Sequence, residues 1–428
     1  MSRWRWVLQK LGRQLWLRAT LIGSLGILAA LFATVAERFL PWTFARTIGA
    51  DAVDSILTII ASSMLAVTTF SLSIMTSAYG SATSTVTPRA TRLLIEDRLT
   101  QNVLSTFLGS FLFGIVGLVV LKTGAYGDRG RAVLFMVTIG VIALIVITLL
   151  RWIDHLTRLG RVGETTARVE EAARRAIEAR LAAPCLGARP LTDPPAEGLR
   201  RPVLAGEVGY LQHIDMPALS DCAEALACDI HVLLNPGAFV YPHTVLCTIP
   251  LDAAGGSDGD ASAPDGPDGL DRIRAAFTLG AERSFDQDPR FGLVVMCEIG
   301  SRALSAAVND AGTAIDVIGR TTRLLTLWAA GAGEGPDPDK VAHPRVFLIP
   351  LREEDLFDDA FMLLARDGAG LIEVQLRLQK ALAALARTGS DRFRAAARFQ
   401  AGLARDRARQ ALTVAEDIRR LEAAAAGS

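Results

Sequence analysis

Four hydroxyl-bearing residues share one long apolar segment, and their spacing suggests a common role. They are Ser62, Thr69, Ser73 and Thr76. Their separations of seven, four and three residues place them on one face of a helix. Such a stripe can line an aqueous path, because hydroxyls partly replace the water around a passing solute. The same hydroxyls can instead bond to neighbouring helices or to carbonyls of their own helix. The pattern predicts pore lining or helix packing.

A second group of polar residues lies much later in the chain. It consists of Arg283, Asp286, Asp288, Arg302, Asn309 and Asp310. Guanidinium and carboxylate groups of this kind can form a buried ligand site. Ionic side chains that hold helices against a β-rich module explain the pattern equally well. The sequence leaves both alternatives open.

A third group follows the hydroxyl-rich segment. Residues 87–99 are predicted to form a short amphipathic helix, with Pro88 in its first turn. The residues of interest are Arg89, Arg92, Asp97 and Arg98. A basic face is favourable near anionic headgroups, so we expect interfacial anchoring. The alternative is a coupling element that responds to a cytosolic domain.

Familiar catalytic and metal-binding patterns have no counterpart in the sequence. The five histidines and five cysteines lack metal-ligand spacing, and no Gly-x-Ser-x-Gly elbow occurs. Residues 331–340 are Gly-rich but lack the ending that a P-loop needs. The odd, irregularly spaced cysteines fit a reducing compartment. We therefore expect no metal, no cofactor and no enzymatic activity. The formal net charge of zero gives no reason to expect a nucleic-acid partner.

The elements that carry these residues divide the chain into an apolar and a polar part. Half of the 428 residues are hydrophobic, and the excess lies before Arg151. Four uncharged stretches are long enough to cross about 30 Å of hydrocarbon. They are predicted to be transmembrane helices at about 19–36, 55–79, 103–121 and 133–150, within a domain of residues 19–155. The absence of charge inside them disfavours an ion-coupled transporter.

Basic residues near the helix ends predict the orientation. They are concentrated in the N-terminal tail (residues 1–18), in the loop after the second helix and beyond the fourth. Both termini are therefore expected in the cytoplasm, with the helices in a bacterial inner membrane. A cleaved signal peptide over the first segment is the alternative. The third helix has small residues four apart, which predicts close packing between helices or subunits.

The polar part is expected to form a cytosolic α+β domain. Residues 156–205 are predicted to be a helical and Pro-rich linker, and 206–250 a small β-barrel or sandwich-like module. Residues 251–272 are rich in Asp and Gly and are expected to be disordered. Helices are predicted over 273–428. The fold class is an α-helical membrane protein with four transmembrane helices and this domain behind them.

Nearly the whole chain resembles an uncharacterised bacterial family, a predicted membrane protein with a domain of unknown function. The matching motifs are Phe70-Ser71, Pro88-Arg89, Gly209-Tyr210-Leu211-Gln212, Ile214-Asp215, Pro236-Gly237-Ala238-Phe239-Val240, Arg283, Gln287-Asp288-Pro289, Arg302-Ala303-Leu304-Ser305 and Asn309-Asp310. The chain departs from the family pattern at Ala238, His243, Ala306 and Ala311, where the family has an acidic residue, a glycine and two prolines. The resemblance implies a membrane protein and brings no activity.

We predict an oligomeric channel or pore-like protein in which the second helix lines the path. The cytosolic domain then assembles the subunits or senses a small molecule whose identity the sequence does not give. The expected partners are the lipid bilayer and further copies of the chain. The alternative is a membrane-anchored sensor or scaffold whose cytosolic domain binds a partner or small molecule. A membrane enzyme is the weakest alternative.

Overall fold

The computed structural model describes residue 6 and residues 15–36, 50–95, 97–123, 128–192, 200–251, 267–332 and 341–426. Most of the expected N-terminal tail and most of the Asp/Gly-rich loop at 251–272 lie outside the described residues. The chain forms two compact units. The helical unit contains Val7–Ser84 and Pro88–Thr165. The C-terminal unit contains Thr166–Ser428 together with Met1–Trp6 and Thr85–Thr87.

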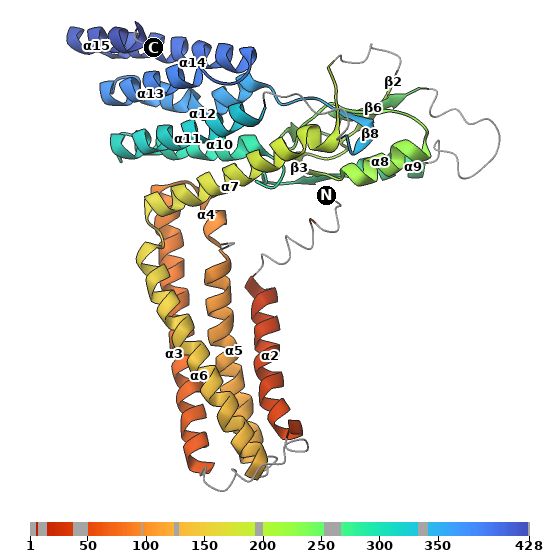
Figure 1. Ribbon diagram of the computed structural model, residues 1–428, viewed down its shortest axis with the longest axis vertical. Coiled ribbons are helices and arrows are strands. Elements are labelled where there is room, and N and C mark those ends of the chain that lie inside the picture. Colours follow the sequence, from red (N-terminus) through yellow and green to blue (C-terminus); the bar gives the residue numbers. More distant parts are fainter. Residues whose placement is uncertain are drawn as a thin grey trace, which may run out of the picture. The chain divides into compact units, whose positions relative to one another are not determined.

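Long helices dominate the helical unit (Figure 1). They are α2 (Leu15–Ala36), α3 (Ala50–Thr85), α5 (Arg98–Lys122) and α6 (Asp128–Arg158). Three of them, α3, α5 and α6, are long and apolar enough to cross a membrane. Helix α2 contains a shorter apolar helix, Trp16–Phe32. Each predicted transmembrane segment is thus helical, but by length and composition three of the described helices qualify as spans, where the sequence predicts four.

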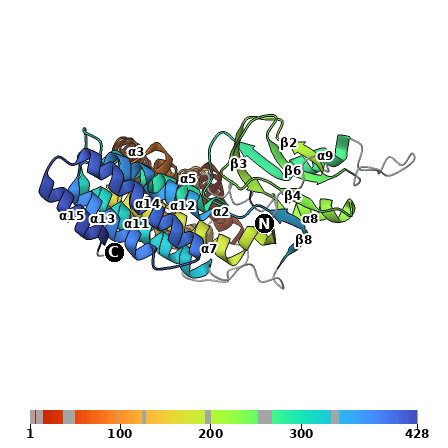
Figure 2. The same ribbon diagram turned by 90° about the horizontal axis from the view of Figure 1, so that it is seen from above.

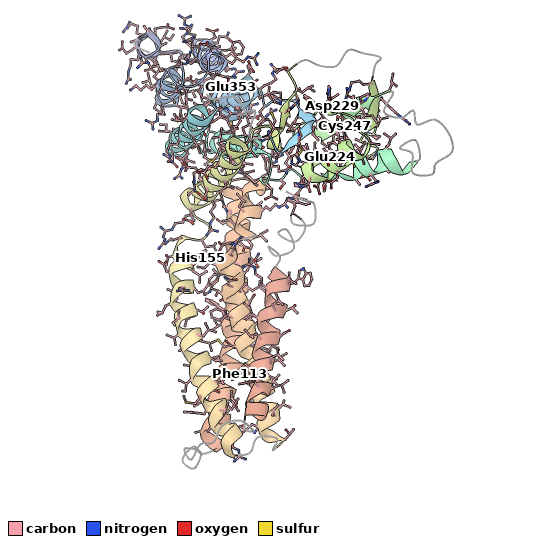
Figure 3. The ribbon with its side chains drawn as sticks, turned by 45° about the vertical axis from the view of Figure 1, so that its right-hand side comes forward. Phe113, His155, Glu224, Asp229, Cys247 and Glu353 are labelled. Atoms are coloured by element: carbon pink, nitrogen blue, oxygen red, sulfur yellow. The ribbon has the colours of Figure 1, made fainter. Side chains whose placement is uncertain are left out.

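Small residues bring the helices of this unit together. A Cβ atom at Gly26 of α2 would come 2.5 Å from the carbonyl oxygen of Gly109 in α5. A Cβ atom at Gly114 of α5 would come 3.2 Å from the carbonyl oxygen of Leu57 in α3. The buried Phe113, labelled in Figure 3, packs in the same core as Leu57. The close helix packing that the small residues predict is therefore confirmed within the chain.

The short helix α4 (Pro88–Ile95) ends earlier than predicted. Asp97 has an extended backbone and accepts a hydrogen bond from the Thr100 N–H at 3.0 Å, so it caps the start of α5. The single helix predicted over 87–99 is therefore wrong at its C-terminal end. The α4 backbone is tied to α3, since the Tyr79 hydroxyl donates to the Leu94 carbonyl at 3.3 Å.

The C-terminal unit contains two sheets. The five-stranded sheet has the order β1-β8-β4-β6-β2, and the three-stranded sheet has the order β5-β3-β7. The bounds are β1 (Ala188–Pro190), β2 (Arg200–Leu204), β3 (Gly209–Ile214), β4 (Ile230–Val232), β5 (Phe239–Val240), β6 (Val245–Pro250), β7 (Phe277–Gly280) and β8 (His343–Leu348). Strand β8 pairs in parallel with β1 and β4, whereas β6 is antiparallel to β4 and β2.

Four of these strands, β1, β2, β7 and β8, lie outside the predicted β-rich module at 206–250. The strands β1 and β8 are far apart in sequence and pair in parallel. Their pairing therefore has no hairpin pattern in the sequence from which it could be predicted. The predicted linker and helical region therefore each contribute strands to the sheets. The shared core beneath the strands is apolar and includes Leu211, Ile230 and Val346.

Helices make up the rest of the unit and gather beside the sheets (Figure 2). They are α7 (Val162–Ala182), α8 (Met216–Ala225), α9 (Pro267–Ala275), α10 (Pro289–Ala303), α11 (Ala311–Gly331), α12 (Glu353–Asp367), α13 (Ile372–Leu385), α14 (Asp391–Ala411) and α15 (Ala415–Ala426). A short 3-10 helix, η2 (Pro184–Gly187), follows α7. Helices α10 to α15 pack on one another around Phe357, Phe361 and Phe393, which are fully buried.

Candidate functional site

The four predicted pore-lining residues all lie on α3 and are exposed in the single chain. We call Ser62, Thr69, Ser73 and Thr76 the hydroxyl face. Three of these side chains donate to carbonyls of their own helix: Ser62 to Thr58 at 2.9 Å, Thr69 to Leu65 at 2.9 Å and Thr76 to Leu72 at 2.8 Å. A hydroxyl that donates in this way still presents its oxygen as an acceptor. The exposed positions of α6 between residues 136 and 150 are all apolar, as at Ile139 and Ile147, whereas α3 exposes apolar side chains such as Phe70 beside its hydroxyls.

The residues predicted to anchor the chain at the interface, or alternatively to couple it to the cytosolic domain, are divided between α4 and the start of α5. Arg89 and Arg92 lie on α4, whereas Arg98 opens α5 and is exposed. Asp97 contacts α6, because one of its carboxylate oxygens lies 3.3 Å from His155 Nε2. The His155 ring in turn stacks on Trp152. Asp97 therefore ties the start of α5 to the end of α6.

The predicted polar cluster is divided between the two ends of α10. Arg283, Asp286 and Asp288 precede the helix, whereas Arg302, Asn309 and Asp310 lie at or beyond its end. Fifteen helical residues separate the groups by about 20 Å. Asp310 caps α11 by accepting from the Thr313 N–H at 3.0 Å. The structure thus brings three of the six residues to one place.

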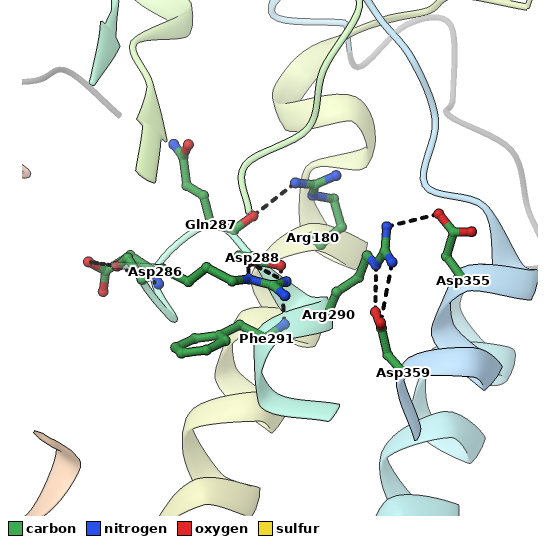
Figure 4. Close-up of polar contacts among 10 residues, drawn as sticks. Arg180, Asp286, Gln287, Asp288, Arg290, Phe291, Asp355 and Asp359 are labelled. Carbon is green, nitrogen blue, oxygen red and sulfur yellow. Dashed lines mark hydrogen bonds and ion pairs between the residues drawn. The ribbon is translucent and has the colours of Figure 1, made fainter. Parts of the chain in front are cut away.

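At that place is a network of buried and partly buried ionic side chains (Figure 4). We define the Arg–Asp network as Arg180, Arg283, Arg290, Asp288, Asp355 and Asp359. At its centre, Arg283 Nη2 lies 2.7 Å from an oxygen of Asp288, whose side chain is 1% exposed. Asp288 also caps α10 by accepting from the Phe291 N–H at 3.1 Å. Burial raises the pKa of Asp288, and the Arg283 guanidinium opposes that rise.

Gly237 closes the loop over this pair. Its φ of +98° is one that glycine adopts readily and other residues avoid. A Cβ atom at this position would come 2.1 Å from Asp288 Oδ2 and 2.9 Å from Arg283 Nη2. The Pro236-Gly237 turn therefore lies so close to the ion pair that no side chain fits at position 237.

Arg180 of α7 enters the network from another direction. It donates to the Asn235 side-chain oxygen at 3.0 Å and to the Gln287 carbonyl at 3.0 Å. Its Nε is buried without a hydrogen-bond acceptor among the described residues. Burial lowers the pKa of Arg180 to about 10, so the side chain stays charged at neutral pH.

Arg290 joins α10 to α12. Its guanidinium bonds Asp359 at 2.6 Å and Asp355 at 2.8 Å. Burial lowers the pKa of Arg290, but the two carboxylates outweigh it and the pKa rises overall. Sequence analysis did not single out Arg180, Arg290, Asp355 or Asp359. The four-residue spacing of the two aspartates on one helix is the signal that was available.

The family-motif residue Gln287 holds the network to the three-stranded sheet. Its side-chain oxygen accepts from the Ile214 N–H at 2.9 Å, and its amide donates to the Ile214 carbonyl at 3.3 Å. This pair of bonds reproduces the pairing of a neighbouring strand. The network therefore fastens α7, α10 and α12 to β3, and its chemistry in this arrangement is ionic and structural.

Trp6 packs against the same region. Its indole Nε1 donates to Asp286 at 2.9 Å, and its ring stacks on His213 with centroids 5.2 Å apart. The indole is 4% exposed. Trp6 was not predicted as a site residue, and no spacing in the sequence connects it to residues more than two hundred positions later.

The described residues of the chain were also compared with the patterns of metal sites and reactive thiols. Within the part of the chain that the structure describes, no three His, Cys, Asp or Glu side chains gather as a metal-binding group. All five cysteines are free and buried. Burial raises the pKa of the Cys247 thiol, so this sulfur is unreactive at neutral pH.

Comparisons with known proteins bear on the chain as a whole. Residues 12–384 match the model of a family described as "Predicted membrane protein (DUF2254)". Uncharacterized proteins of Mycobacterium bovis and Mycobacterium tuberculosis are each 26% identical over 257 residues, which is 59% of this chain and 47% of each relative. The chain spans about half the length of the curated relatives it matches. No solved structure matches it.

Proposed function

Given that the chain belongs to the DUF2254 family of predicted membrane proteins, we propose that it is an oligomeric channel or pore-like protein. The hydroxyl face of α3 lines its path. The observation that carries this proposal is that α3 exposes four hydroxyls among apolar side chains such as Phe70, whereas every exposed residue of α6 between 136 and 150 is apolar. A face that borders lipid needs no hydroxyls, whereas a face that borders water or another subunit uses them.

The contacts of the C-terminal unit support four membrane crossings. Trp6 contacts Asp286, and the Thr87 hydroxyl donates to Glu298 at 3.3 Å. A chain that returns to one side of a bilayer crosses it an even number of times. Helices α2 and α3 lie between Trp6 and Thr87, and α5 and α6 lie between Thr87 and residue 166. The 22 residues of α2 rise about 33 Å, enough to cross the hydrocarbon.

The same contacts support a sensing role for the C-terminal unit. The turn at Thr87 separates the proposed lining helix from α5, and it is bonded to α10, whose first turn carries the Arg–Asp network. Basic residues at the helix ends support termini in the cytoplasm and an inner-membrane location.

Substituted cysteines test the lining. The variants S62C, T69C, S73C and T76C, in a background with the five native cysteines replaced, are treated with a water-soluble thiol reagent in membranes. A wet path makes these positions reactive, because water allows the thiol to ionise and the thiolate then attacks the reagent. The matched controls I139C and I147C on the apolar face of α6 stay unreactive. Equal inertness of both sets contradicts the proposal.

Conductance in planar bilayers tests the activity itself. The reconstituted full chain is expected to pass current in potassium chloride, and the double variant T69L/S73L is expected to lose it because leucines dry the path. The control I139L/I147L retains the current. A protein that passes no current and remains monomeric in detergent refutes the proposal.

A membrane-anchored sensor is the second candidate, and one observation favours it. Three hydroxyls of the face are already bonded to their own helix, so a lipid-facing position leaves those donors satisfied. In that case, replacing α3 and α5 by unrelated apolar helices leaves the binding properties of the C-terminal unit intact. Loss of all activity after the replacement favours the channel.

A further inference from the structure

A cavity of about 740 Å³ lies at one end of the five-stranded sheet. The charged residues that line it are Arg189, Arg200, Arg345 and Asp229. Arg189 lies on β1, Arg345 on β8, Arg200 opens β2 and Asp229 immediately precedes β4. The cavity volume is in the range of small-molecule sites. We call it the basic cavity; Asp229, labelled in Figure 3, marks its place.

The lining of this cavity contains three arginines and one aspartate, and Arg200 has further contacts of its own. Arg189 packs over the Phe347 ring at 5.9 Å, and neither it nor Arg345 forms an ion pair with any described residue. Guanidinium groups are charged at neutral pH. A concave surface with unneutralised cations concentrates anions.

Arg200 and Asp229 are held in place by the sheet. Arg200 Nε donates to the Thr248 hydroxyl at 3.0 Å, and its Nη2 donates to the Asp229 carbonyl at 2.6 Å. Ala227, with φ of +50°, turns the chain from α8 towards β4. The Arg200 guanidinium and the backbone at Asp229 are therefore held in place by these bonds.

The Asp229 carboxylate indicates that the ligand carries hydrogen-bond donors as well as an anionic group. An ionised carboxylate only accepts hydrogen bonds, so a ligand beside it must supply donors. Arginine forks match the oxygens of phosphate in a bidentate geometry. We propose that the basic cavity binds a phosphate ester that also carries hydroxyl groups, with Arg189 and Arg345 on the phosphate and Asp229 on a hydroxyl. This inference goes beyond the channel proposal and does not depend on it.

Binding of glycerol 3-phosphate to the full chain in detergent tests the assignment by calorimetry. The double variant R189Q/R345Q is expected to bind at least about tenfold more weakly, because charge-assisted hydrogen bonds contribute that much or more each. The control R352Q/R419Q removes the same charge from exposed surface positions and keeps the affinity. Thermal unfolding checks that all variants are folded. Equal affinity in wild type and R189Q/R345Q overturns the proposal.

A second variant tests the role of Asp229. In D229A the preference for glycerol 3-phosphate over inorganic phosphate is expected to disappear, because alanine neither repels the bare anion nor accepts hydrogen bonds from the hydroxyls. A preference that persists in D229A overturns the hydroxyl assignment.

Nanodiscs distinguish a soluble ligand from a lipid headgroup, since both offer the same glycerol phosphate chemistry. Co-purified phosphatidylglycerol that is retained by wild type and lost from R189Q/R345Q identifies the headgroup as the source. Glycerol 3-phosphate binding that is unaffected by phosphatidylglycerol identifies a soluble ester. Failure to retain either ligand overturns the proposal, whatever conductance the channel experiment records.

Discussion

Gly237 is the residue at which one added methyl group is expected to be most destabilising. Gly237→Ala forces a side chain against the Arg283–Asp288 pair and into a backbone region that alanine avoids. We expect the free energy of unfolding to fall by about 3 kcal/mol, from backbone strain and overpacking together. Chemical denaturation of the detergent-solubilised protein measures it.

Gly402 of α14 provides the matched control. A Cβ atom there meets nothing within 4 Å, and the residue lies inside a helix. Gly402→Ala is therefore expected to raise the free energy of unfolding by about 1 kcal/mol. Similar effects from both substitutions would show that the Gly237 conformation does not matter.

Two histidines predict how the C-terminal unit responds to acid. Burial lowers the pKa of His231, with Arg200 adding to the effect, and burial lowers the pKa of His343. The unfolded chain then takes up protons first as the pH falls below the ordinary histidine value of about 6.5. The free energy of unfolding therefore decreases through that range and levels off below the folded-state values.

The double variant H231Q/H343Q is expected to flatten this decrease. Thermal unfolding over a pH series from neutral to mildly acidic measures the slope in both proteins. A variant as acid-sensitive as the wild type would contradict the assignment to these two side chains.

The two members of the central ion pair, Arg283 and Asp288, could be predicted from the sequence, whereas the residues around them could not. Arg283 and Asp288 are five residues apart, so their polarity is visible in one window of sequence. Arg180 and Asn235 reach the same place from distant parts of the chain. Side chains that meet only through tertiary packing leave no spacing pattern to detect.

At the scale of elements, the junction of α10 and α12 depends on Arg290. In Arg290→Met the carboxylates of Asp355 and Asp359 lose their shared partner. We expect the free energy of unfolding at neutral pH to fall by about 2 kcal/mol, less than for a fully buried pair because the arginine is partly exposed.

Acidification is expected to relieve part of that loss. Burial already raises the pKa of Asp359, and Arg290 opposes the rise. Without Arg290 the carboxyl group takes up a proton at higher pH, which removes an unpaired buried charge. Denaturation over a pH series shows whether the deficit shrinks. Arg419→Met, at an exposed ion pair, serves as the control with little change.

The apolar cores of the long helices could be predicted from the sequence, whereas the residues at which these helices begin and end could not. The predicted segments 55–79, 103–121 and 133–150 are the apolar cores of longer helices, α3, α5 and α6. Hydropathy registers the part that faces hydrocarbon, whereas the helix continues until a cap or turn ends it. Helix α5 begins at a residue set by Asp97, not at the edge of its apolar run.

At the scale of the whole molecule, Trp6 predicts that the N-terminus and the C-terminal unit share one side of the membrane. A photo-reactive phenylalanine analogue at position 6 is expected to cross-link to peptides that contain His213 or Asp286, as mass spectrometry would show. The same analogue at Trp16, which is 61% exposed on α2, provides the control and gives no such peptide. Cross-links absent from both positions would remove the support for an even number of crossings.

The hydrogen bond between Trp6 and Asp286 also determines when Trp6 can reach its native position during biosynthesis. Asp286, the hydrogen-bond acceptor of the indole, is added to the growing chain 280 residues after Trp6. At ordinary elongation rates that interval is about 15 to 60 s. The membrane helices between them are made within that time. Trp6 therefore reaches this native contact only after a further 280 residues have been made.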